Sequence, residues 1–413
     1  MSFDKFNFSA QINESLRKNS FVKPTPIQSK VIPLVLEKKD VMAKAQTGSG
    51  KTASFVLPIV DMLLKDKKKG KARIRVLVIT PTRELTAQVS EIFKTFGESL
   101  KVVSIVGGES LGDQLYDIQQ GCDIVVATSG RLLDVFSKKQ MNLSKLEFFV
   151  LDEADKMLDL GFSIELENIL KELPEKRQNL LFSATYPQKM LDIAYKISKN
   201  PIEVSIKEEK QTAEFIKQRA IQVNLENRRV LLRELLKINK WKLILVFIAT
   251  KRAADNIAKK FRKYGYQAES FHGNLEQEER KYTLEDFKNK KINILFATDI
   301  AARGLDIDDI DCVVNYDLPR SPLDYIHRIG RTARAGKSGT AISFITHENS
   351  EHFKLIEKRC QISLKKEQIK GFELTGIPLK QEKGKAPIKS KRKSKKDKLR
   401  EKKQLKYGLA PSQ

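Results

Sequence analysis

The sequence predicts an α/β protein of two tandem parallel-sheet domains, joined by a short linker and followed by a basic tail that we expect to be disordered. In the first half, apolar runs with the composition of strands alternate with helical patterns, and after a polar segment the alternation starts again. Several runs are apolar throughout, as in strands covered on both faces. Such alternation is typical of βαβ units, which build parallel sheets. We therefore divide the chain into a prelude, a first domain, a linker, a second domain and a tail, at 1–39, 40–207, 208–216, 217–361 and 362–413.

The expected strands lie in segments that are rich in Val, Ile and Phe. In the first half these segments are 40–45, 73–80, 101–106, 122–128, 146–155, 179–185 and 202–206. In the second half they are 219–224, 242–250, 268–273, 293–298, 312–317 and 339–346. The two halves share too little sequence identity for us to assign an internal repeat.

The composition narrows the class of partner and the compartment. The chain has 413 residues and a formal net charge of +25, which favours an acidic polymer as partner, nucleic acid first and an anionic membrane second. Cys122, Cys312 and Cys360 lie far apart, which suggests neither a disulfide framework nor a zinc site and fits a reducing compartment. The first residues lack a secretory pattern, and no apolar run reaches the ~18 residues that a membrane helix needs. We expect a soluble, cytoplasmic protein without a membrane partner.

The prelude combines aromatic residues with a proline-stiffened segment, SFVKPTPIQ, at 20–28. Its Thr25 and Gln28 offer side-chain hydrogen bonds, and Phe3 lies upstream. A purine ring needs an amide that both donates and accepts, together with an aromatic face for stacking. The alternative is a segment that only caps the first strand, and these residues leave both interpretations open.

Residues 45–52 have the composition of a phosphate-binding loop between a strand and a helix. Gly48 and Gly50 leave backbone N–H groups open to an anion, while Lys51 offers an ammonium to the outer phosphates and Thr52 a hydroxyl to Mg²⁺. Apolar residues then recur at helical spacing, which places the phosphate at a helix N-terminus. Ala45 stands where the strict pattern has glycine, so an ordinary turn is the alternative. The predicted nucleotide-binding residues are Ala45, Gln46, Thr47, Gly48, Ser49, Gly50, Lys51 and Thr52. The second half has no further Gly-Lys-Thr.

Two acids, Asp152 and Glu153, follow the apolar run FFVL. In ATPases with such a loop an acid at this place holds Mg²⁺, and we assign this to Asp152, acting through water because Mg²⁺ keeps several of its waters. Glu153 is placed to orient or deprotonate the attacking water. Ser183 and Thr185, at the end of another strand, are able to hydrogen-bond the carboxylates of 152–155 and couple them to other parts of the molecule. A surface acidic turn is the alternative, disfavoured because such acids are costly without a cation.

Three arginines of the second half, Arg328, Arg331 and Arg334, recur every three residues and therefore share one side of a turn or helix. Guanidinium groups suit phosphate, and the charge that develops on a γ-phosphoryl group needs such a donor, often supplied by another domain. A basic turn that faces RNA or forms salt bridges is the alternative.

The tail is strongly basic between 383 and 406, where thirteen Lys and Arg residues face two acids. Such a block repels itself and should be disordered alone. We interpret it as a sequence-tolerant tether to phosphate backbones, with a salt-dependent affinity. A tail that only improves solubility is the alternative.

These motifs, in this order, resemble those of the DEAD-box ATP-dependent RNA helicases of superfamily 2. The resemblance covers about residues 2 to 360. The matching segments are PTPIQ (24–28), AQTGSGKT (45–52), PTREL (81–85), GG (107–108), TSGR (128–131), DEAD (152–155), SAT (183–185), VFIAT (246–250), HG (272–273), ATDIAARGLD (297–306) and HRIGRTAR (327–334). The compact second half and the basic tail are similar to those of bacterial RhlE-type members.

The resemblance implies two RecA-like domains with ATP and RNA bound in the cleft between them. It places adenine against Phe3, Phe21 and Gln28. It also implies that Gly304 and Asp306 contact the nucleotide from the second domain, and that Arg331 and Arg334 are arginine fingers. Lys51, Asp152 and Glu153 keep the roles given above. RNA contacts are implied for Arg83, Gly108, Thr128 and Arg131 in the first domain and for Arg252, Gly273, Arg280, Thr298 and Arg303 in the second.

The chain departs from the family pattern in three places. Ser129 replaces the usual proline of TPGR, Thr86 replaces the alanine that follows PTREL, and Ser20 stands where glycine is common. The first two lie in RNA-binding loops, so we expect them to affect the RNA geometry more than the ATP chemistry.

We therefore expect an RNA-dependent ATPase that opens short RNA duplexes locally and remodels RNA or ribonucleoprotein structures. It would use ATP and Mg²⁺, bind the RNA backbone with little sequence preference, and act as a monomer. Ribosomal precursors and the RNA-decay machinery are candidate partners. A DNA-directed helicase and a non-enzymatic RNA-binding scaffold with a vestigial nucleotide site are the alternatives.

Overall fold

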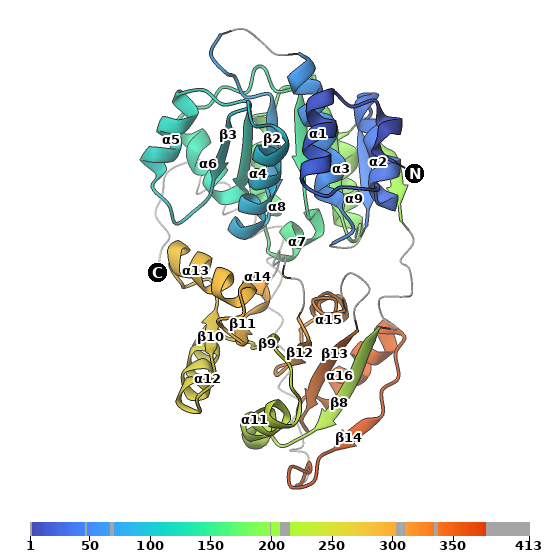
Figure 1. The fold of residues 1–413 in the computed structure, drawn as a ribbon, viewed down its shortest axis with the longest axis vertical. Coiled ribbons are helices and arrows are strands. Elements are labelled where there is room, and N and C mark those ends of the chain that lie inside the picture. The colour runs from blue at the N-terminus through green and yellow to red at the C-terminus, as the bar shows by residue number, and fades with distance from the viewer. Residues whose placement is uncertain are drawn as a thin grey trace, which may run out of the picture.

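Two separate seven-stranded sheets organise the chain (Figure 1). The computed structural model describes residues 2–45, 48–66, 70–198, 200–206, 215–302, 307, 310–333 and 338–376. Every strand pairing within these residues is parallel. The predicted fold class, two tandem parallel-sheet α/β domains, is confirmed. The two units are called the first and second lobes below.

The first sheet has the strand order β3-β4-β2-β5-β6-β1-β7. Its strands are β1 Val41–Lys44, β2 Val76–Thr80, β3 Val102–Ile105, β4 Ile124–Thr128, β5 Phe148–Leu151, β6 Gln178–Ser183 and β7 Ile202–Ser205. The helices of this lobe are the short η1 Phe3–Phe6, α1 Ala10–Lys18, α2 Pro26–Leu36, α3 Lys51–Lys65, α4 Arg83–Phe96, α5 Leu111–Gln119, α6 Ser129–Ser137, α7 Ala154–Asp159, α8 Ser163–Lys171 and α9 Gln188–Ile197. Each of the apolar runs expected in this half overlaps one of these strands.

The second sheet has the order β10-β11-β9-β12-β13-β8-β14. Its strands are β8 Ile216–Gln222, β9 Ile244–Phe247, β10 Ala268–Phe271, β11 Ile294–Ala297, β12 Cys312–Asn315, β13 Gly339–Ile345 and β14 Lys366–Gln368. The helices are the short η2 Leu225–Asn227, α11 Arg228–Ile238, α12 Lys251–Lys263, α13 Gln277–Lys288, α14 Asp299–Ala302, α15 Pro322–Ile329 and α16 Ser350–Cys360.

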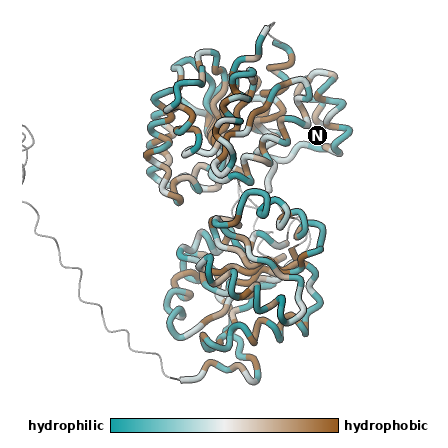
Figure 2. The backbone as a smooth tube through the Cα atoms, turned by 90° about the vertical axis from the view of Figure 1, so that its left-hand side faces the viewer, coloured by the Kyte–Doolittle hydropathy of each residue, from teal (hydrophilic) through white to brown (hydrophobic). Residues whose placement is uncertain are grey.

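Both faces of the first sheet are buried, which explains its continuous apolar strands. Successive residues of a strand point to opposite faces. Val76 and Val78 of β2 accordingly belong to one apolar cluster, and Leu77 and Ile79 belong to another. The hydrophobic stretches gather inside each lobe and the hydrophilic ones lie outside (Figure 2).

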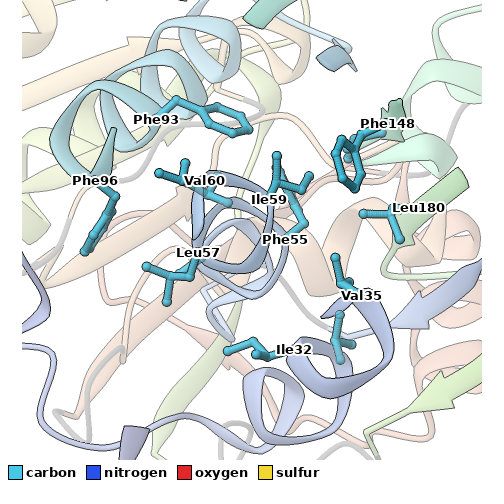
Figure 3. Close-up of a cluster of buried hydrophobic side chains, with 14 of the residues drawn as sticks. Ile32, Val35, Phe55, Leu57, Ile59, Val60, Phe93, Phe96, Phe148 and Leu180 are labelled. Atoms are coloured by element: carbon cyan, nitrogen blue, oxygen red, sulfur yellow. The ribbon is translucent and has the colours of Figure 1, made fainter. Parts of the chain in front are cut away.

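Helix α3, which follows the phosphate loop, lies at the centre of one of these clusters. Figure 3 shows Phe55, Leu57 and Val60 of α3 among side chains of α2, α4 and the neighbouring strands. The rings of Phe55 and Phe182 of β6 are tilted against each other, with their centroids 5.0 Å apart. The loop is therefore fixed at both ends, by strand β1, which pairs with β6 and β7, and by a buried helix.

The second lobe extends further along the chain than we expected. Residues 362–376 were assigned to the tail, but β14 pairs with β8 at the edge of the second sheet. Ile369 and Phe372 also pack against the apolar core. The expected linker overlaps the start of β8 at Ile216, and its other residues lie mainly outside the described part of the chain, as does the basic block 383–406. Among the described helices, none has the length and apolarity needed to cross a bilayer.

Candidate nucleotide and nucleic-acid site

The phosphate loop connects β1 to the N-terminus of α3. Gly48 and Gly50 have φ of +84° and +90°, a left-handed conformation that side chains other than glycine rarely adopt. A Cβ atom on Gly50 would also lie 2.5 Å from Nε2 of Gln28. The loop therefore has the conformation that requires glycine at both positions, and phosphate binding by its N–H groups stays a prediction. Gln46 and Thr47 lie outside the described residues.

Lys51 is the first residue of α3 and its side chain is buried. Its Nζ donates a 2.6 Å hydrogen bond to the carbonyl oxygen of Ala45, across the loop. Burial lowers the pKa of Lys51, while the charges of Asp152, Glu153 and Asp155 oppose this shift. The ammonium group therefore lies over the loop, near the acids. When a nucleotide binds, it can donate its hydrogen bond to a phosphate oxygen in place of the Ala45 carbonyl oxygen.

The two acids lie directly after β5, beside the loop. The Asp152 carboxylate is 2% exposed and accepts a 2.9 Å hydrogen bond from the backbone N–H of Glu153. Burial and the negative charge of Glu153 raise the pKa of Asp152 to about 7. A cation bound here would stabilise the ionised form. Thr52, at the start of α3, completes the donor pair predicted for Mg²⁺.

The residues present fit a magnesium ion that is shared with a nucleotide. The described residues hold no group of three or more His, Cys, Asp or Glu that could form a metal site by themselves. Mg²⁺ is commonly bound through one or two carboxylates together with substrate phosphates. Asp152 and the Thr52 hydroxyl suit that pattern.

Ser183 and Thr185 contact the end of the DEAD segment. The backbone N–H and Oγ1 of Thr185 donate to Oδ2 of Asp155 at 3.0 and 3.1 Å. Oγ of Ser183 accepts from the Asp155 N–H at 3.1 Å and donates to the Thr185 carbonyl. The two segments are therefore one hydrogen-bonded unit, and its role in coupling stays a prediction.

The PTPIQ segment is joined to the phosphate loop through Gln28. Oε1 of Gln28 accepts from the Thr25 N–H at 2.9 Å, which forms a capping box at the start of α2. Its Nε2 donates to the Gly50 carbonyl at 3.2 Å. The capping interpretation of this segment is therefore visible in the structure, and adenine recognition by the same amide stays a prediction.

Phe3 and Phe21 are part of an aromatic cluster on the first lobe. Their ring centroids lie 6.4 Å apart, and Phe21 packs edge-on against Phe96 at 5.4 Å. Phe3 is 4% exposed. Its ring therefore has a packing role in the core, and the adenine stacking that the resemblance implies for it stays a prediction.

The arginines of the second lobe differ in what they contact. Arg328 is held by Asp299, with Nε–Oδ1 and NH2–Oδ2 distances of 2.6 and 2.7 Å. Arg331 donates from Nε to the His327 carbonyl at 3.3 Å. Its charge acts on the pKa values of Lys51 and Glu153, so it lies near the acids of the first lobe. The salt-bridged alternative therefore describes Arg328, and the role of Arg331 as an arginine finger stays a prediction. Arg334, Gly304 and Asp306 lie outside the described residues.

The RNA-contact candidates of the first lobe gather where β2, β3 and β4 end. Gly108 has a φ of +83°, and a Cβ there would lie 2.2 Å from NH1 of Arg83. Arg131 donates from its two terminal nitrogens to the Glu109 carbonyl at 3.0 and 3.1 Å. Thr128 ends β4 directly before α6. Glycine at 108 therefore leaves room for the Arg83 guanidinium.

Two candidates in this region link the lobes. Arg280 of α13 is buried, and its Nε lies 2.6 Å from Oε1 of Glu84 on α4. NH1 of Arg83 donates to Oε1 of Gln277 at 3.3 Å. Arg280 also stands 4.4 Å above the Phe271 ring. The RNA role predicted for Arg280 remains untested, and its ion pair with Glu84 was not foreseen.

The remaining second-lobe candidates lie around the ends of β9, β10 and β11. Arg252 and Gly273 are exposed, and the Thr298 backbone N–H donates to the Phe271 carbonyl at 3.2 Å. Arg303 lies outside the described residues.

The two departures in RNA-binding loops have local explanations. The Thr86 hydroxyl is buried and bonds to Oγ1 of Thr80 at 2.6 Å and to the Thr82 carbonyl at 3.0 Å. Ser129 is buried as the first residue of α6, a position that proline also accepts. Both residues therefore fit the helix starts that carry the loops.

Comparison with known proteins identifies the class to which this fold and site belong. Residues 25–193 match the family model described as DEAD/DEAH box helicase, and residues 227–336 match the helicase conserved C-terminal domain. The ATP-dependent RNA helicase CshA of Listeria monocytogenes is 41% identical over 358 residues, which cover 86% of this chain and 68% of that protein. The chain belongs to the DEAD-box family of ATP-dependent RNA helicases.

Solved structures show the same two-lobe architecture. Saccharomyces cerevisiae Dbp5 bound to RNA and ADP BeF3 is 31% identical and matches with a TM-score of 0.78 over 89% of this chain and 95% of that one. A DEAD box protein from Methanococcus jannaschii is 39% identical, with a TM-score of 0.51 over 90% of this chain and 99% of that one. The RhlE-type assignment within the family stays a prediction.

Proposed function

We propose that this protein hydrolyses ATP when RNA is bound and uses the cycle to open short RNA duplexes and remodel RNA or ribonucleoprotein structures. The observation that carries the proposal is the division of the catalytic groups. Lys51, Asp152 and Glu153 lie on the first lobe, whereas Arg331 comes from the second and lies close enough for its charge to act on the pKa values of Lys51 and Glu153. Membership of the DEAD-box family supports the same activity.

ATP hydrolysis requires that charge on the γ-phosphoryl group be stabilised and that a water molecule be placed in line with it. The loop N–H groups and Lys51 hold the phosphates, and Arg331 meets the developing charge from the other lobe. Glu153 orients the water and accepts its proton. A magnesium ion, held by Asp152 and Thr52, would neutralise part of the phosphate charge. Only the assembled pair of lobes has the complete set, so turnover depends on their approach.

RNA that binds to both lobes at once would bring them together. Arg83, Gly108, Thr128 and Arg131 form one half of the proposed RNA surface, and the second lobe supplies the other half. The chain matches the Dbp5 structure with RNA and ADP BeF3 more closely than the M. jannaschii structure, which has the more similar sequence. This difference supports an arrangement of the lobes like that of the complex. Backbone and ribose contacts favour RNA over DNA through the 2′-OH group.

The test is a pair of assays on the whole protein. Phosphate release from ATP should rise at least tenfold with saturating RNA, and a matched DNA strand should give no such rise. Lys51→Ala should abolish turnover, and Arg331→Ala should lower kcat while sparing ATP affinity. Equal rates with and without RNA would reject the coupling, equal stimulation by DNA would favour a DNA-directed helicase, and no phosphate release at all would favour a scaffold.

Several finer statements belong to the same proposal. The family membership supports a cytoplasmic monomer that acts on RNA and not on a membrane, with a first domain near the limits drawn from the sequence and a second domain that extends to residue 376. Ribosomal precursors and the RNA-decay machinery are the proposed targets. Crosslinking the protein to RNA in cells and sequencing the bound RNA would identify them.

A further inference from the structure

Lys156, the residue directly after the DEAD segment, is a buried cation beside the catalytic acids. It lies on α7 and is 2% exposed. A lone ammonium at this depth is unfavourable by several kcal/mol unless an anion compensates it. Neither the phosphates nor the RNA contacts described above use this residue.

The compensating anion is Glu153, the residue assigned to the attacking water. Nζ of Lys156 lies 2.6 Å from Oε2 of Glu153. Glu153 is 5% exposed, and its backbone has φ 51° and ψ 47°, the left-handed region that non-glycine residues seldom occupy. Such a conformation persists only where the surroundings hold it. The ion pair joins the side chain of this strained residue to the helix that it caps.

Two further cations act on the same carboxylate. The charges of Lys51 and Arg331 both stabilise ionised Glu153, although less than Lys156 does. These are also the two cations that the phosphates need. Because Lys156 supplies Glu153 with a counter-ion on its own helix, ionised Glu153 keeps its strongest cationic partner when Lys51 and Arg331 bind phosphate.

We propose that Lys156 is a positioning residue for ATP hydrolysis, which fixes the Glu153 carboxylate toward the attacking water and leaves Lys51 and Arg331 to the phosphates. The proposal rests on the function proposed above. Lys156 makes and breaks no bond in the reaction. Phosphoryl transfer depends on position and charge more than on a strong base, so a carboxylate held in an ion pair is compatible with this role.

The test compares steady-state ATPase kinetics of the whole protein at saturating RNA. Lys156→Met, which keeps the length and removes the charge, should lower kcat by about 10- to 100-fold, within the range of a displaced general base. KM for ATP should change by less than about threefold, as should RNA affinity with a non-hydrolysable ATP analogue. Lys156→Arg should recover kcat to within about fivefold of the wild type. Adding Lys156→Met to Glu153→Gln should slow single turnover by less than twofold more, since the carboxylate is already lost.

A matched control exists on α16. Lys354 pairs with Glu351 at the same i, i+3 spacing and 2.7 Å, but both side chains are exposed, at 66% and 81%. Lys354→Met should leave every constant unchanged, because exposed pairs contribute little. If Lys156→Met fails to fold, Lys156→Gln replaces it with the same expected values.

The outcomes separate this inference from the proposed function. An unchanged kcat in folded Lys156→Met or Lys156→Gln overturns the inference, as does an equal loss of analogue-dependent RNA binding, which would mean that Lys156 acts on lobe docking. A further large loss in the double variant also overturns it. If the wild type itself shows no RNA-stimulated turnover, the proposed function fails, whatever the variants do.

Discussion

Asp152 shows how strongly burial shapes a catalytic carboxyl. It is enclosed at the end of β5 and neighbours a second acid, so its ionised form is unfavourable without a cation. The same residue that would hold magnesium therefore destabilises the empty protein at neutral pH. This conflict between binding and stability is common where charge is prepared for a ligand.

The conflict predicts a pH dependence of stability. The pKa of Asp152 is raised from 3.8 to about 7, so the folded state binds the proton more tightly than the unfolded state between these values. The free energy of unfolding should therefore fall as pH rises from about 4 to about 7, relative to Asp152→Asn, which cannot ionise. Urea unfolding followed by circular dichroism, without nucleotide, measures this. Parallel curves for the two proteins would contradict the expectation.

Gly50 gives a second prediction at this scale. Gly50→Ala adds a Cβ 2.5 Å from the Gln28 amide at a φ of +90°, so both backbone strain and displacement of Gln28 are expected. The loss in unfolding free energy should be about 2–4 kcal/mol, with weaker ATP binding.

Gly265→Ala is the matched control for Gly50→Ala. Its φ is +85°, but nothing lies within 4 Å of the new Cβ, so it carries only the strain, about 1–2 kcal/mol. Equal losses in unfolding free energy, measured by urea denaturation, would show that the contact with Gln28 is unimportant.

The loop, the acids and the SAT segment were predictable because each is a contiguous motif at the end of an apolar strand. The contacts of Lys156 and Arg328 could not be predicted, because a single lysine or arginine in a sequence does not indicate which acid it will contact. The pairing of Glu84 with Arg280 joins positions that are far apart in the chain, and only the packed lobes bring them together.

At the scale of elements, the strands were predictable because burial on both faces gives continuous apolar runs. β14 escaped prediction because it is short and polar, with the sequence KEQ. It forms at a sheet edge, where one face and one side need no apolar cover. Arg219 of β8 holds it through Glu367, with the closest N–O distance 2.6 Å.

Truncation tests the contribution of this edge. A chain that ends at residue 376 should unfold like the full protein, whereas one that ends at 361 should lose about 2–4 kcal/mol in the second lobe, because Ile369 and Phe372 leave the core. Trp241, the single tryptophan, packs on this core and reports the unfolding by fluorescence. If both shortened chains unfold at the same urea concentration, residues 362–376 do not stabilise the second lobe and belong to the tail.

At the scale of the whole molecule, the fold class and the approach of the two lobes were expected from the sequence, but the side-chain contacts that join the lobes were not. The Glu84–Arg280 pair spans them and is buried on both sides, with 8% and 7% of the side chains exposed. A buried pair of this kind is costly to break from one side, since the remaining charge is left uncompensated.

A double-mutant cycle measures this link. Glu84→Gln and Arg280→Gln should each weaken RNA binding in the presence of a non-hydrolysable ATP analogue, and adding Glu84→Gln to Arg280→Gln should cause no further loss, a coupling of about 1–3 kcal/mol. The Arg219–Glu367 pair lies within the second lobe and serves as the control. Replacing either of its residues by Gln should lower the stability of that lobe and leave the RNA affinity unchanged. Additive effects for the first pair would show that the contact does not join the lobes during binding.

The attachment of 362–376 has a consequence for how this protein can be tagged. Asn224 holds Thr375 at the far end of β8 through two hydrogen bonds of 2.8 and 3.2 Å. A fluorescent label or a domain that is joined directly after residue 376 would therefore move with the second lobe and report its position.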